Sequence, residues 1–296
     1  MTLPTFLIVG AGRSGTTTLY QALRRHPQVF MSPVKEPSYF VYCDRQLPDG
    51  PGAGWVRETA VTTLEEYEAL FAEAGGARAI GEASPRYLSS AAAPERIHAL
   101  LPEVRLVAIL RNPVDRAFAN YLGFRRDGFD PAPTFDAALD DQERRRREGW
   151  AFGAFLDFGL YARQLERYRR LFGQQQLRVY LFEDLVDAPA ALSRDLLEFI
   201  GVDPEAALDL SERHGRTGEL RGPLLGWLWR HSTRVRALVR PAVPLALRDA
   251  AFAWVMRGQR KPEMTASQRD RLLDFYADDI TRLQELLQRD LSAWLN

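Results

Sequence analysis

The segment from Phe6 to Tyr20 constrains the fold of this 296-residue chain more than any other stretch. An apolar run, Phe6–Val9, precedes a glycine-rich turn, Gly10–Gly15, and three consecutive threonines follow. The apolar run predicts a buried strand, and the glycines let the backbone turn tightly and approach a ligand closely. A helix that begins at the threonines would present free N–H groups and a partial positive charge. The segment therefore predicts a strand, an anion-binding turn and a helix in immediate succession.

This turn is compatible with three kinds of nucleotide or anion site. Its three glycines have the spacing of the dinucleotide fingerprint, but the carboxylate expected after the second strand would be Glu36, which does not end an apolar run. Gly10 and Gly15 also have Walker A spacing, but Thr16 stands where that motif has its phosphate-binding lysine. The threonine hydroxyls suit a phosphate or sulfate cradle. The turn alone leaves all three interpretations open.

Short apolar runs alternate with longer helical stretches along the rest of the chain. Buried strands are expected at Phe6–Gly10, Val29–Met31, Ala79–Gly81, Val104–Leu110 and Leu177–Phe182. Helices are expected at Thr16–Arg25, Leu64–Ala74, Ala92–Leu101, Pro113–Arg126, Phe135–Arg147, Tyr161–Phe172 and Pro189–Ile200, with a long amphipathic helix from Thr265 onward. This alternation predicts an α/β fold with a central, mostly parallel sheet between two helical layers. No convincing linker interrupts it, so residues 1–296 are expected to form a single domain.

The charges of the chain balance overall but are unevenly distributed. Lysine and arginine number 39, and so do aspartate and glutamate, which argues against nucleic acid as a partner. Between Ser211 and Lys261, however, eleven basic residues face three acidic ones, so this segment could hold a compact anion. Within it, Pro223–Met256 is basic and aromatic, and predicts either two packed helices or a wall for an acceptor, including a membrane-surface helix. The run Arg144–Arg147 is interpreted as a solvated helix face.

Cysteine content and the start of the chain bear on the compartment. Cys43 is the only cysteine, so no internal disulfide can form, and a reducing, cytoplasmic compartment is expected. No cysteine and histidine cluster has zinc spacing, so no metal site is predicted. The N-terminal residues lack the basic region and apolar core of a signal peptide, and no run approaches the roughly 20 apolar residues of a membrane span.

A second motif follows the predicted strand Val104–Leu110. Arg111 stands directly after this strand, and ligands of open α/β sheets bind at the carboxyl ends of the strands. The planar guanidinium of arginine is suited to a phosphate group. Pro113 is expected to be the first residue of the next helix. The motif therefore predicts a second anion contact at the same edge of the sheet as the first loop.

With both motifs, the chain resembles sulfotransferases that use 3′-phosphoadenosine 5′-phosphosulfate, a broad group that includes the heparan-sulfate enzymes and many bacterial relatives. The resemblance covers nearly the whole chain. Its elements are the phosphosulfate loop Gly12–Tyr20, then His26–Pro27, Lys35–Phe40 and Gly81–Tyr87, the 3′-phosphate element Leu110–Ala117, and finally Gly159–Tyr161 and Tyr180–Leu185. The resemblance implies the P-loop-NTPase-like sulfotransferase fold, with a central, mostly parallel sheet in three layers.

The resemblance also implies a set of donor-binding residues. They are Arg13, Ser14, Gly15, Thr16, Thr17 and Thr18 in the first loop and Arg111 at the 3′-phosphate. Two positions depart from the family pattern. Arg13 stands where the heparan-type enzymes usually have lysine, and in this it resembles the protein-tyrosine sulfotransferases, which have arginine. Ala119 stands where the family often has a serine that contacts the 3′-phosphate. Arg216 or Arg221, in a basic segment that the family places over the nucleotide, could replace that contact.

The implied reaction is transfer of a sulfuryl group to a hydroxyl or amine, which leaves 3′-phosphoadenosine 5′-phosphate as product. Glu36 is the candidate general base, and Arg13 would stabilise charge on the leaving group but is a poor proton donor. Lys35 either pairs with Glu36 or faces the sulfuryl oxygens. The acceptor would be a small molecule, a glycan or a lipid-like compound. The first alternative function is a P-loop nucleotide kinase or NTPase. An NAD-type oxidoreductase ranks after it, and a non-enzymatic nucleotide-binding protein ranks last.

Overall fold

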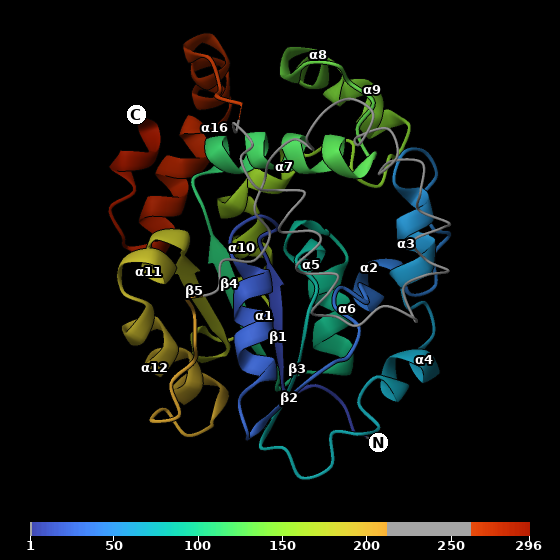
Figure 1. The fold of residues 1–296 in the computed structure, drawn as a ribbon, viewed down its shortest axis with the longest axis vertical. Coiled ribbons are helices and arrows are strands. Elements are labelled where there is room, and N and C mark those ends of the chain that lie inside the picture. The colour runs from blue at the N-terminus through green and yellow to red at the C-terminus, as the bar shows by residue number, and fades with distance from the viewer. Residues whose placement is uncertain (1, 212–261) are drawn as a thin grey trace.

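Five parallel strands form one sheet in the computed structural model, which describes residues 2–211 and 262–296 (Figure 1). The strands are β1 (Phe6–Gly10), β2 (Val29–Met31), β3 (Ala79–Ala83), β4 (Arg105–Leu110) and β5 (Leu177–Leu181). Their order across the sheet is β2-β3-β1-β4-β5, so the strand before the glycine-rich turn lies at the centre. The expected parallel sheet is confirmed, and each predicted strand is present within two residues of its expected bounds.

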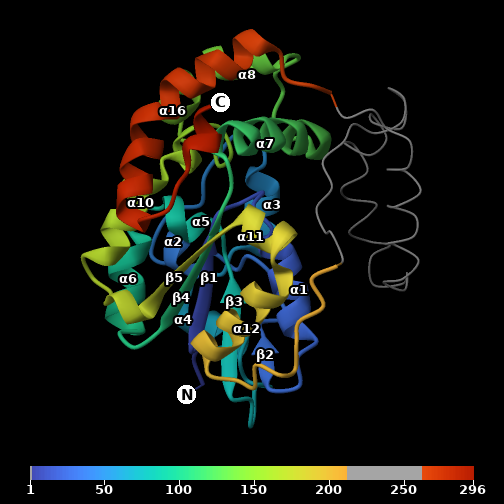
Figure 2. The ribbon, with the colours of Figure 1, turned by 90° about the vertical axis from the view of Figure 1, so that its left-hand side faces the viewer.

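Helices cover both faces of this sheet, which confirms the three-layer architecture (Figure 2). One face carries α1 (Thr16–Arg24), α11 (Phe182–Asp187) and α12 (Pro189–Ile200). The other carries α5 (Arg86–Ser89), α6 (Ala93–Leu100), α7 (Pro113–Asp127), α10 (Tyr161–Arg169) and α16 (Ala266–Leu287). The C-terminal helix α16 is the long amphipathic helix expected after Thr265, whose side chain caps it by accepting a hydrogen bond from the backbone N–H of Gln268.

The central strand β1 is apolar throughout because both faces of the sheet are buried there. Leu7 and Val9 of β1 belong to the core on the α5–α7 side, whereas Phe6 and Ile8 belong to the core against α1 and α12. Side chains of a strand alternate between its two faces, so a strand between two cores needs apolar residues at every position. This explains the continuous apolar sequence of β1, whereas β3 contains the buried Glu82 and β5 contains the exposed Arg178.

Several short helices were not predicted, and one predicted helix is divided. The additional helices are α2 (Tyr39–Tyr42), α3 (Ala53–Thr59), α5 and α11, whereas the expected helix Leu64–Ala74 is present as the shorter α4 (Leu64–Ala69). The expected helix Phe135–Arg147 is two helices, α8 (Phe135–Asp140) and α9 (Gln142–Arg147), which meet at Asp141. A helix of four to seven residues completes at most two turns, too few for a periodic apolar pattern to show.

The prediction that Arg144–Arg147 is a solvated face is wrong for Arg145. Its side chain is 1% exposed and forms a two-pronged ion pair with Asp130, which is equally buried, at 2.7 Å and 2.9 Å. Arg144 and Arg146 are exposed as expected, with carboxylate partners at the surface. Four consecutive helical residues point in four directions, so one member of a charged run can face inward where a distant aspartate receives it.

The segments that follow β1, β3, β4 and β5 leave the sheet at its carboxyl edge, as the parallel topology requires. In the described ranges, no helix has the length and apolar character needed to cross a bilayer. The segment 212–261, which holds Arg216, Arg221 and the basic aromatic stretch Pro223–Met256, lies outside the described residues.

Candidate functional site

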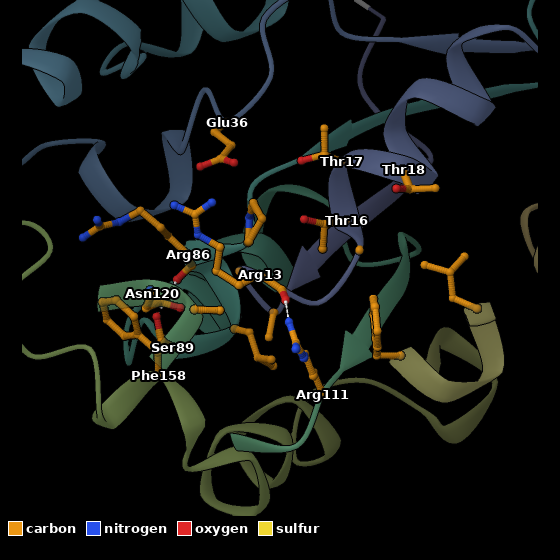
Figure 3. Close-up of a pocket in the computed structure, with 18 of the residues that line it drawn as sticks. Arg13, Thr16, Thr17, Thr18, Glu36, Arg86, Ser89, Arg111, Asn120 and Phe158 are labelled. Carbon is orange, nitrogen blue, oxygen red and sulfur yellow. Dashed lines mark hydrogen bonds between the residues drawn. The ribbon is translucent and has the colours of Figure 1, made fainter. Parts of the chain in front are cut away.

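A cavity of about 1340 Å³ opens at the carboxyl edge of the sheet (Figure 3). Its walls come from segments far apart in the chain: the turn after β1, the loop after β2, α5 after β3, Arg111 after β4, the middle of α7, and Phe182 after β5. In Figure 3, Thr16–Thr18 lie to one side of Arg13, and Glu36 and Arg86 lie to the other. The two motifs found in the sequence therefore meet in one cavity, which Glu36 also lines.

The turn after β1 requires glycine at its last position, Gly15. Gly15 precedes α1 at φ 102°, and a Cβ there would lie 2.6 Å from Cδ2 of Leu185, so both its backbone conformation and its packing require glycine. The first residues of α1, Thr16–Thr18, line the cavity. Ser14, by contrast, is fully buried and is not among the residues that line it. The helix start thus faces the cavity with backbone N–H groups and the threonines, as the sequence predicts.

Arg13 reaches across the cavity toward α7. It has a positive φ of 67°, and its Nη2 lies 4.0 Å from Oδ2 of Asp127. A Cβ on Gly123 would be 1.8 Å from that Nη2, so the glycine in the middle of α7 makes the room that the guanidinium fills. Burial and the nearby Arg126 lower the pKa of Arg13, while Asp127 and Glu36 oppose that shift. The guanidinium nevertheless stays charged at neutral pH.

Arg111 presents a cation beside the same turn. Its Nη1 donates to the backbone oxygen of Arg13 at 3.4 Å, and its guanidinium carbon lies 5.0 Å from the ring centre of Phe182. Tyr161 fixes the backbone of Arg111 by donating its hydroxyl hydrogen to that residue's carbonyl oxygen at 3.0 Å. No carboxylate among residues 2–211 and 262–296 forms an ion pair with Arg111. A positioned arginine at the carboxyl end of a parallel strand, with no carboxylate partner in the described part of the chain, suits an anionic ligand.

The loop after β2 carries Glu36 into the cavity in a constrained conformation. Glu36 has a φ of 63°, and its backbone N–H donates to the carbonyl oxygen of Ala83 at the end of β3, at 3.0 Å. Lys35 pairs with the carboxylate of Glu36, and Lys35 itself is not among the residues that line the cavity. A residue other than glycine in this region of φ costs free energy, and such positions concentrate at functional sites. Glu36 is therefore placed by contacts to β3 rather than by its own loop.

A buried carboxylate, which the sequence motif contains but did not single out, supports this loop. Glu82 is fully buried and accepts hydrogen bonds from Ser84 at 2.8 Å and Tyr67 at 3.3 Å. Ser84 in turn accepts from the backbone N–H of Ser38 at 3.0 Å, which connects Glu82 to the turn beside Glu36. Burial raises the pKa of Glu82 to about 7, against the hydrogen bonds that favour its charged form.

The remaining predicted donor positions divide into two groups. Ala119, on α7, is 1% exposed and lines the cavity. Its neighbour Asn120 also lines the cavity, and its Oδ1 accepts a hydrogen bond from the buried Arg116 at 3.0 Å. Arg216 and Arg221 lie outside the described residues.

Sequence reasoning missed several residues that shape this cavity. Gly123 carries the clearest signal, since a glycine inside a helix costs about 1 kcal/mol relative to alanine and needs a packing reason. Arg86 lies within the segment Gly81–Tyr87, which resembles a family element, but its own role was not predicted; its Nη1 donates to the carbonyl oxygen of Ala151 at 2.7 Å, 65 residues away. The missed aromatic lining consists of Trp55, Phe124, Phe129, Phe152 and Phe158. These side chains come from four separate segments, so no local pattern unites them.

Comparisons with known proteins agree with this geometry. Mouse heparan sulfate glucosamine 3-O-sulfotransferase 3A1 is 31% identical over 205 residues, which are 68% of this chain and 46% of that protein. A bovine bifunctional heparan sulfate N-deacetylase/N-sulfotransferase 2 is 28% identical over 308 residues, 99% of this chain and 31% of its own length. This chain thus spans about half or less of the length of these relatives.

Among solved structures, a sulfotransferase from Alicyclobacillus acidocaldarius superposes with a TM-score of 0.78 at 30% sequence identity, over 100% of both chains. A family model described as the sulfotransferase family matches residues 4–206, which include the turn after β1, Glu36, Arg111 and all five strands. This chain therefore belongs to the sulfotransferase family.

Proposed function

We propose that this chain transfers a sulfuryl group from 3′-phosphoadenosine 5′-phosphosulfate to a hydroxyl or amine of an acceptor. One observation carries the proposal: the cavity brings together an anion loop without lysine, the guanidinium of Arg111, which has no carboxylate partner among residues 2–211 and 262–296, and the carboxylate of Glu36. An elongated donor with an anionic group at each end needs two separate anion contacts, and the loop and Arg111 supply them. Membership of the family supports the same donor.

The proposed roles follow from position and charge. Backbone N–H groups of Gly15–Thr18 and the Arg13 guanidinium would hold the 5′-phosphosulfate, and Arg111 would hold the 3′-phosphate. The acceptor oxygen or nitrogen attacks sulfur, the bond from sulfur to the bridging phosphate oxygen breaks, and Glu36 receives the acceptor proton. Lys35, paired with Glu36, would orient that carboxylate. The product nucleotide is 3′-phosphoadenosine 5′-phosphate.

A P-loop kinase or NTPase is disfavoured by the same residues. The lysine that grips the β- and γ-phosphates in such enzymes is replaced by Thr16, which lines the cavity. Sulfuryl transfer, like phosphoryl transfer, depends on in-line positioning and charge stabilisation, and here two arginines provide the charge. The single-domain organisation and the cytoplasmic location predicted from the one cysteine remain proposals.

Thermal stabilisation by nucleotides tests the donor. The chain is melted alone and with 3′-phosphoadenosine 5′-phosphate, ATP or NAD at matched concentrations. A ligand present at 100 times its dissociation constant adds about 2.7 kcal/mol to the stability of the folded state. We expect this stabilisation with the 3′-phosphorylated nucleotide. Stabilisation by ATP or NAD alone would reject the proposal.

Substitution of Glu36 tests the base. Glu36→Gln is expected to lower kcat by about 10² to 10⁴ because it removes a proton acceptor, while leaving the dissociation constant of 3′-phosphoadenosine 5′-phosphate unchanged. Steady-state sulfuryl transfer and calorimetric titration give the two quantities. Glu65→Gln, at an exposed carboxylate on α4, is the control. Equal losses of turnover and nucleotide binding would remove Glu36 from this role.

A further inference from the structure

The loop that carries Glu36 has a conformation that its own residues disfavour. Glu36 and Ser38 both have positive φ, 63° and 53°, although neither is glycine. Side chains strain this region of φ, so the loop keeps its shape only where surrounding contacts impose it. Within the loop, the Ser38 hydroxyl donates to the carbonyl oxygen of Glu36 at 3.3 Å, which is long for a hydroxyl donor. The contacts that place Glu36 must therefore come from other segments.

The end of β3 supplies two of these contacts. The carbonyl oxygen of Ala83 accepts the backbone N–H of Glu36 at 3.0 Å. The hydroxyl oxygen of Ser84 accepts the backbone N–H of Ser38 at 3.0 Å, and the backbone N–H of Ser84 donates to the carbonyl oxygen of Ile8 at 3.1 Å. Because Ile8 lies in β1, which leads into the glycine-rich turn, Ser84 fixes the position of the Glu36 loop relative to that turn.

The hydroxyl of Ser84 is oriented by Glu82. A backbone N–H can only donate, so the Ser84 oxygen must accept at Ser38. The single hydroxyl hydrogen of Ser84 is donated to Oε2 of Glu82 at 2.8 Å. This bond stops the hydroxyl from rotating and keeps a lone pair of Ser84 directed at the loop.

Glu82 also holds the residues that follow Ser38, through a second hydroxyl. Its Oε1 accepts a hydrogen bond from Tyr67 of α4 at 3.3 Å. The Tyr67 ring stacks on that of Tyr39, with ring centres 4.6 Å apart and planes 15° apart, and meets the ring of Phe40 edge-on at 5.3 Å. Tyr39 and Phe40 begin α2, directly after the loop. One carboxyl group thus connects the loop and the next helix to β3.

Glu82 does not itself reach the reacting groups. Its side chain is fully buried and is not among the residues that line the cavity. The other residues of β3 are alanine, isoleucine and glycine. A carboxyl group buried in such a core costs free energy that an apolar side chain of similar size would not. The two hydrogen bonds that Glu82 accepts, rather than its packing, therefore account for a carboxyl group at this position.

We propose that Glu82 is a positioning residue for sulfuryl transfer, which acts through Ser84 and Tyr67 to keep the Glu36 carboxylate in the cavity. This inference rests on the proposed role of Glu36 as the base. Glu82→Gln keeps an oxygen that accepts from Ser84 and gains an amide that donates to Tyr67, whereas Glu82→Leu fills the space without an acceptor. The amide should therefore replace the carboxyl group in this role, and the alkyl group should not.

Amide hydrogen exchange of the full chain tests the hold on the loop. In Glu82→Leu and in Ser84→Ala, the peptide that spans residues 35–41 should exchange about 5-fold to 30-fold faster, the factor expected for one lost hydrogen bond. Glu82→Gln should exchange like the unmodified chain. Thr5→Val is the matched control, because it removes a hydroxyl that accepts the backbone N–H of Ile80 at the opposite end of β3, at 3.0 Å. It should leave exchange of this peptide unchanged.

Turnover distinguishes positioning from a purely structural role. Sulfuryl transfer from 3′-phosphoadenosine 5′-phosphosulfate is measured separately to two probes, 2-naphthol and a desulfated heparan oligosaccharide. Glu82→Leu and Ser84→Ala should each lower kcat by about 10-fold to 100-fold, since a misplacement of about 1 Å can cost 10²-fold, with the dissociation constant of 3′-phosphoadenosine 5′-phosphate unchanged. Glu82→Gln should retain turnover. When Glu36→Gln is already present, Glu82→Leu should cause no further loss, because its effect passes through Glu36.

The outcomes separate this inference from the proposed function. Unchanged loop exchange and turnover in the folded variants Glu82→Leu and Ser84→Ala overturn it, and so does an equal further loss of turnover when Glu36→Gln is present. Both results leave sulfuryl transfer intact. Stabilisation by 3′-phosphoadenosine 5′-phosphate shows that a variant is folded, and loop exchange needs no acceptor, so it decides the inference for any acceptor. Failure of the unmodified chain both to bind this nucleotide and to sulfate either probe removes the proposed function, and this inference with it.

Discussion

Arg111 has a guanidinium at the cavity wall and no carboxylate partner in the described parts of the chain. Arg111→Ala should raise the dissociation constant of 3′-phosphoadenosine 5′-phosphate by about 10-fold to 100-fold, since a hydrogen bond to a charged group is worth roughly 1.5–3 kcal/mol. The dissociation constant of AMP, which lacks the 3′-phosphate, should change little. Isothermal titration of both nucleotides measures this difference. Equal weakening of both would show that Arg111 does not contact the 3′-phosphate.

Gly123 tests the placement of Arg13 without altering Arg13 itself. In Gly123→Ala, the new methyl group would occupy the position of the Arg13 guanidinium, 1.8 Å from Nη2, and the flexible side chain must move. Turnover should fall by about 10² to 10³, the usual cost of losing one charge-stabilising donor. Stability should hold or rise, because alanine favours a helix by about 0.5–1 kcal/mol over glycine. Steady-state kinetics and thermal melting measure the two effects.

Gly75→Ala is the matched control for Gly123→Ala, because no heavy atom lies within 4 Å of a Cβ at Gly75. It should leave turnover unchanged. The double variant Gly123→Ala with Arg13→Ala should be no slower than Arg13→Ala alone if the two changes act through the same guanidinium. Additive losses would mean that Gly123 serves another purpose.

At the scale of elements, α9 is tied to the loop that carries Phe129 by the buried pair between Arg145 and Asp130. Asp130→Ala should lower the free energy of unfolding by up to about 3–5 kcal/mol, because it removes the two-pronged partner of a buried arginine and leaves Arg145, within the described residues, only its ion pair with Asp141 at 3.0 Å. Asp140→Ala, which breaks the exposed pair with Arg271, should cost less than about 1 kcal/mol. Urea unfolding measures both. Similar costs for the two variants would contradict a structural role for the buried pair.

At the scale of the whole molecule, the buried Glu82 makes stability depend on pH. Its pKa is about 7 in the folded chain against an ordinary value of 4.5, so the folded state keeps a proton that the unfolded state releases between these values. The stability that neutral Glu82 contributes is complete below pH 4.5 and is lost as the pH rises to about 7. Relative to Glu82→Gln, the unmodified chain should lose about 3 kcal/mol over this range.

Urea unfolding of both proteins at several pH values checks this dependence. For the control variant Glu65→Gln, at an exposed position, the free energy of unfolding should depend on pH in the same way as for the unmodified chain above pH 5. If the free energy of unfolding of Glu82→Gln shows the same pH dependence as that of the unmodified chain, Glu82 does not titrate in this range in the folded state.

Local pattern predicted much of this molecule. The strand, turn and helix around Gly10–Gly15, the parallel sheet, and the position of Arg111 after β4 all follow from short-range sequence, because a buried strand must be apolar and a parallel topology sends every strand end to one edge. The predicted proximity of the first loop and Arg111 is confirmed: Arg111 donates to the carbonyl oxygen of Arg13. The sequence also predicted Glu36 as a cavity residue, but from family resemblance and not from its own surroundings.

The tertiary structure alone decided how these residues are held. Gly123, 110 positions away in the sequence, leaves the space that the Arg13 guanidinium fills. The carbonyl oxygen of Ala83, at the end of β3, accepts the hydrogen bond that fixes the backbone of Glu36. The cavity wall gathers aromatic rings from separate segments, and Asp130 pairs with an arginine of the run Arg144–Arg147 that faces inward. Periodicity reports only which face of an element is buried. Contacts between distant segments depend on the order of strands and the packing of helices, which no short stretch of sequence encodes by itself.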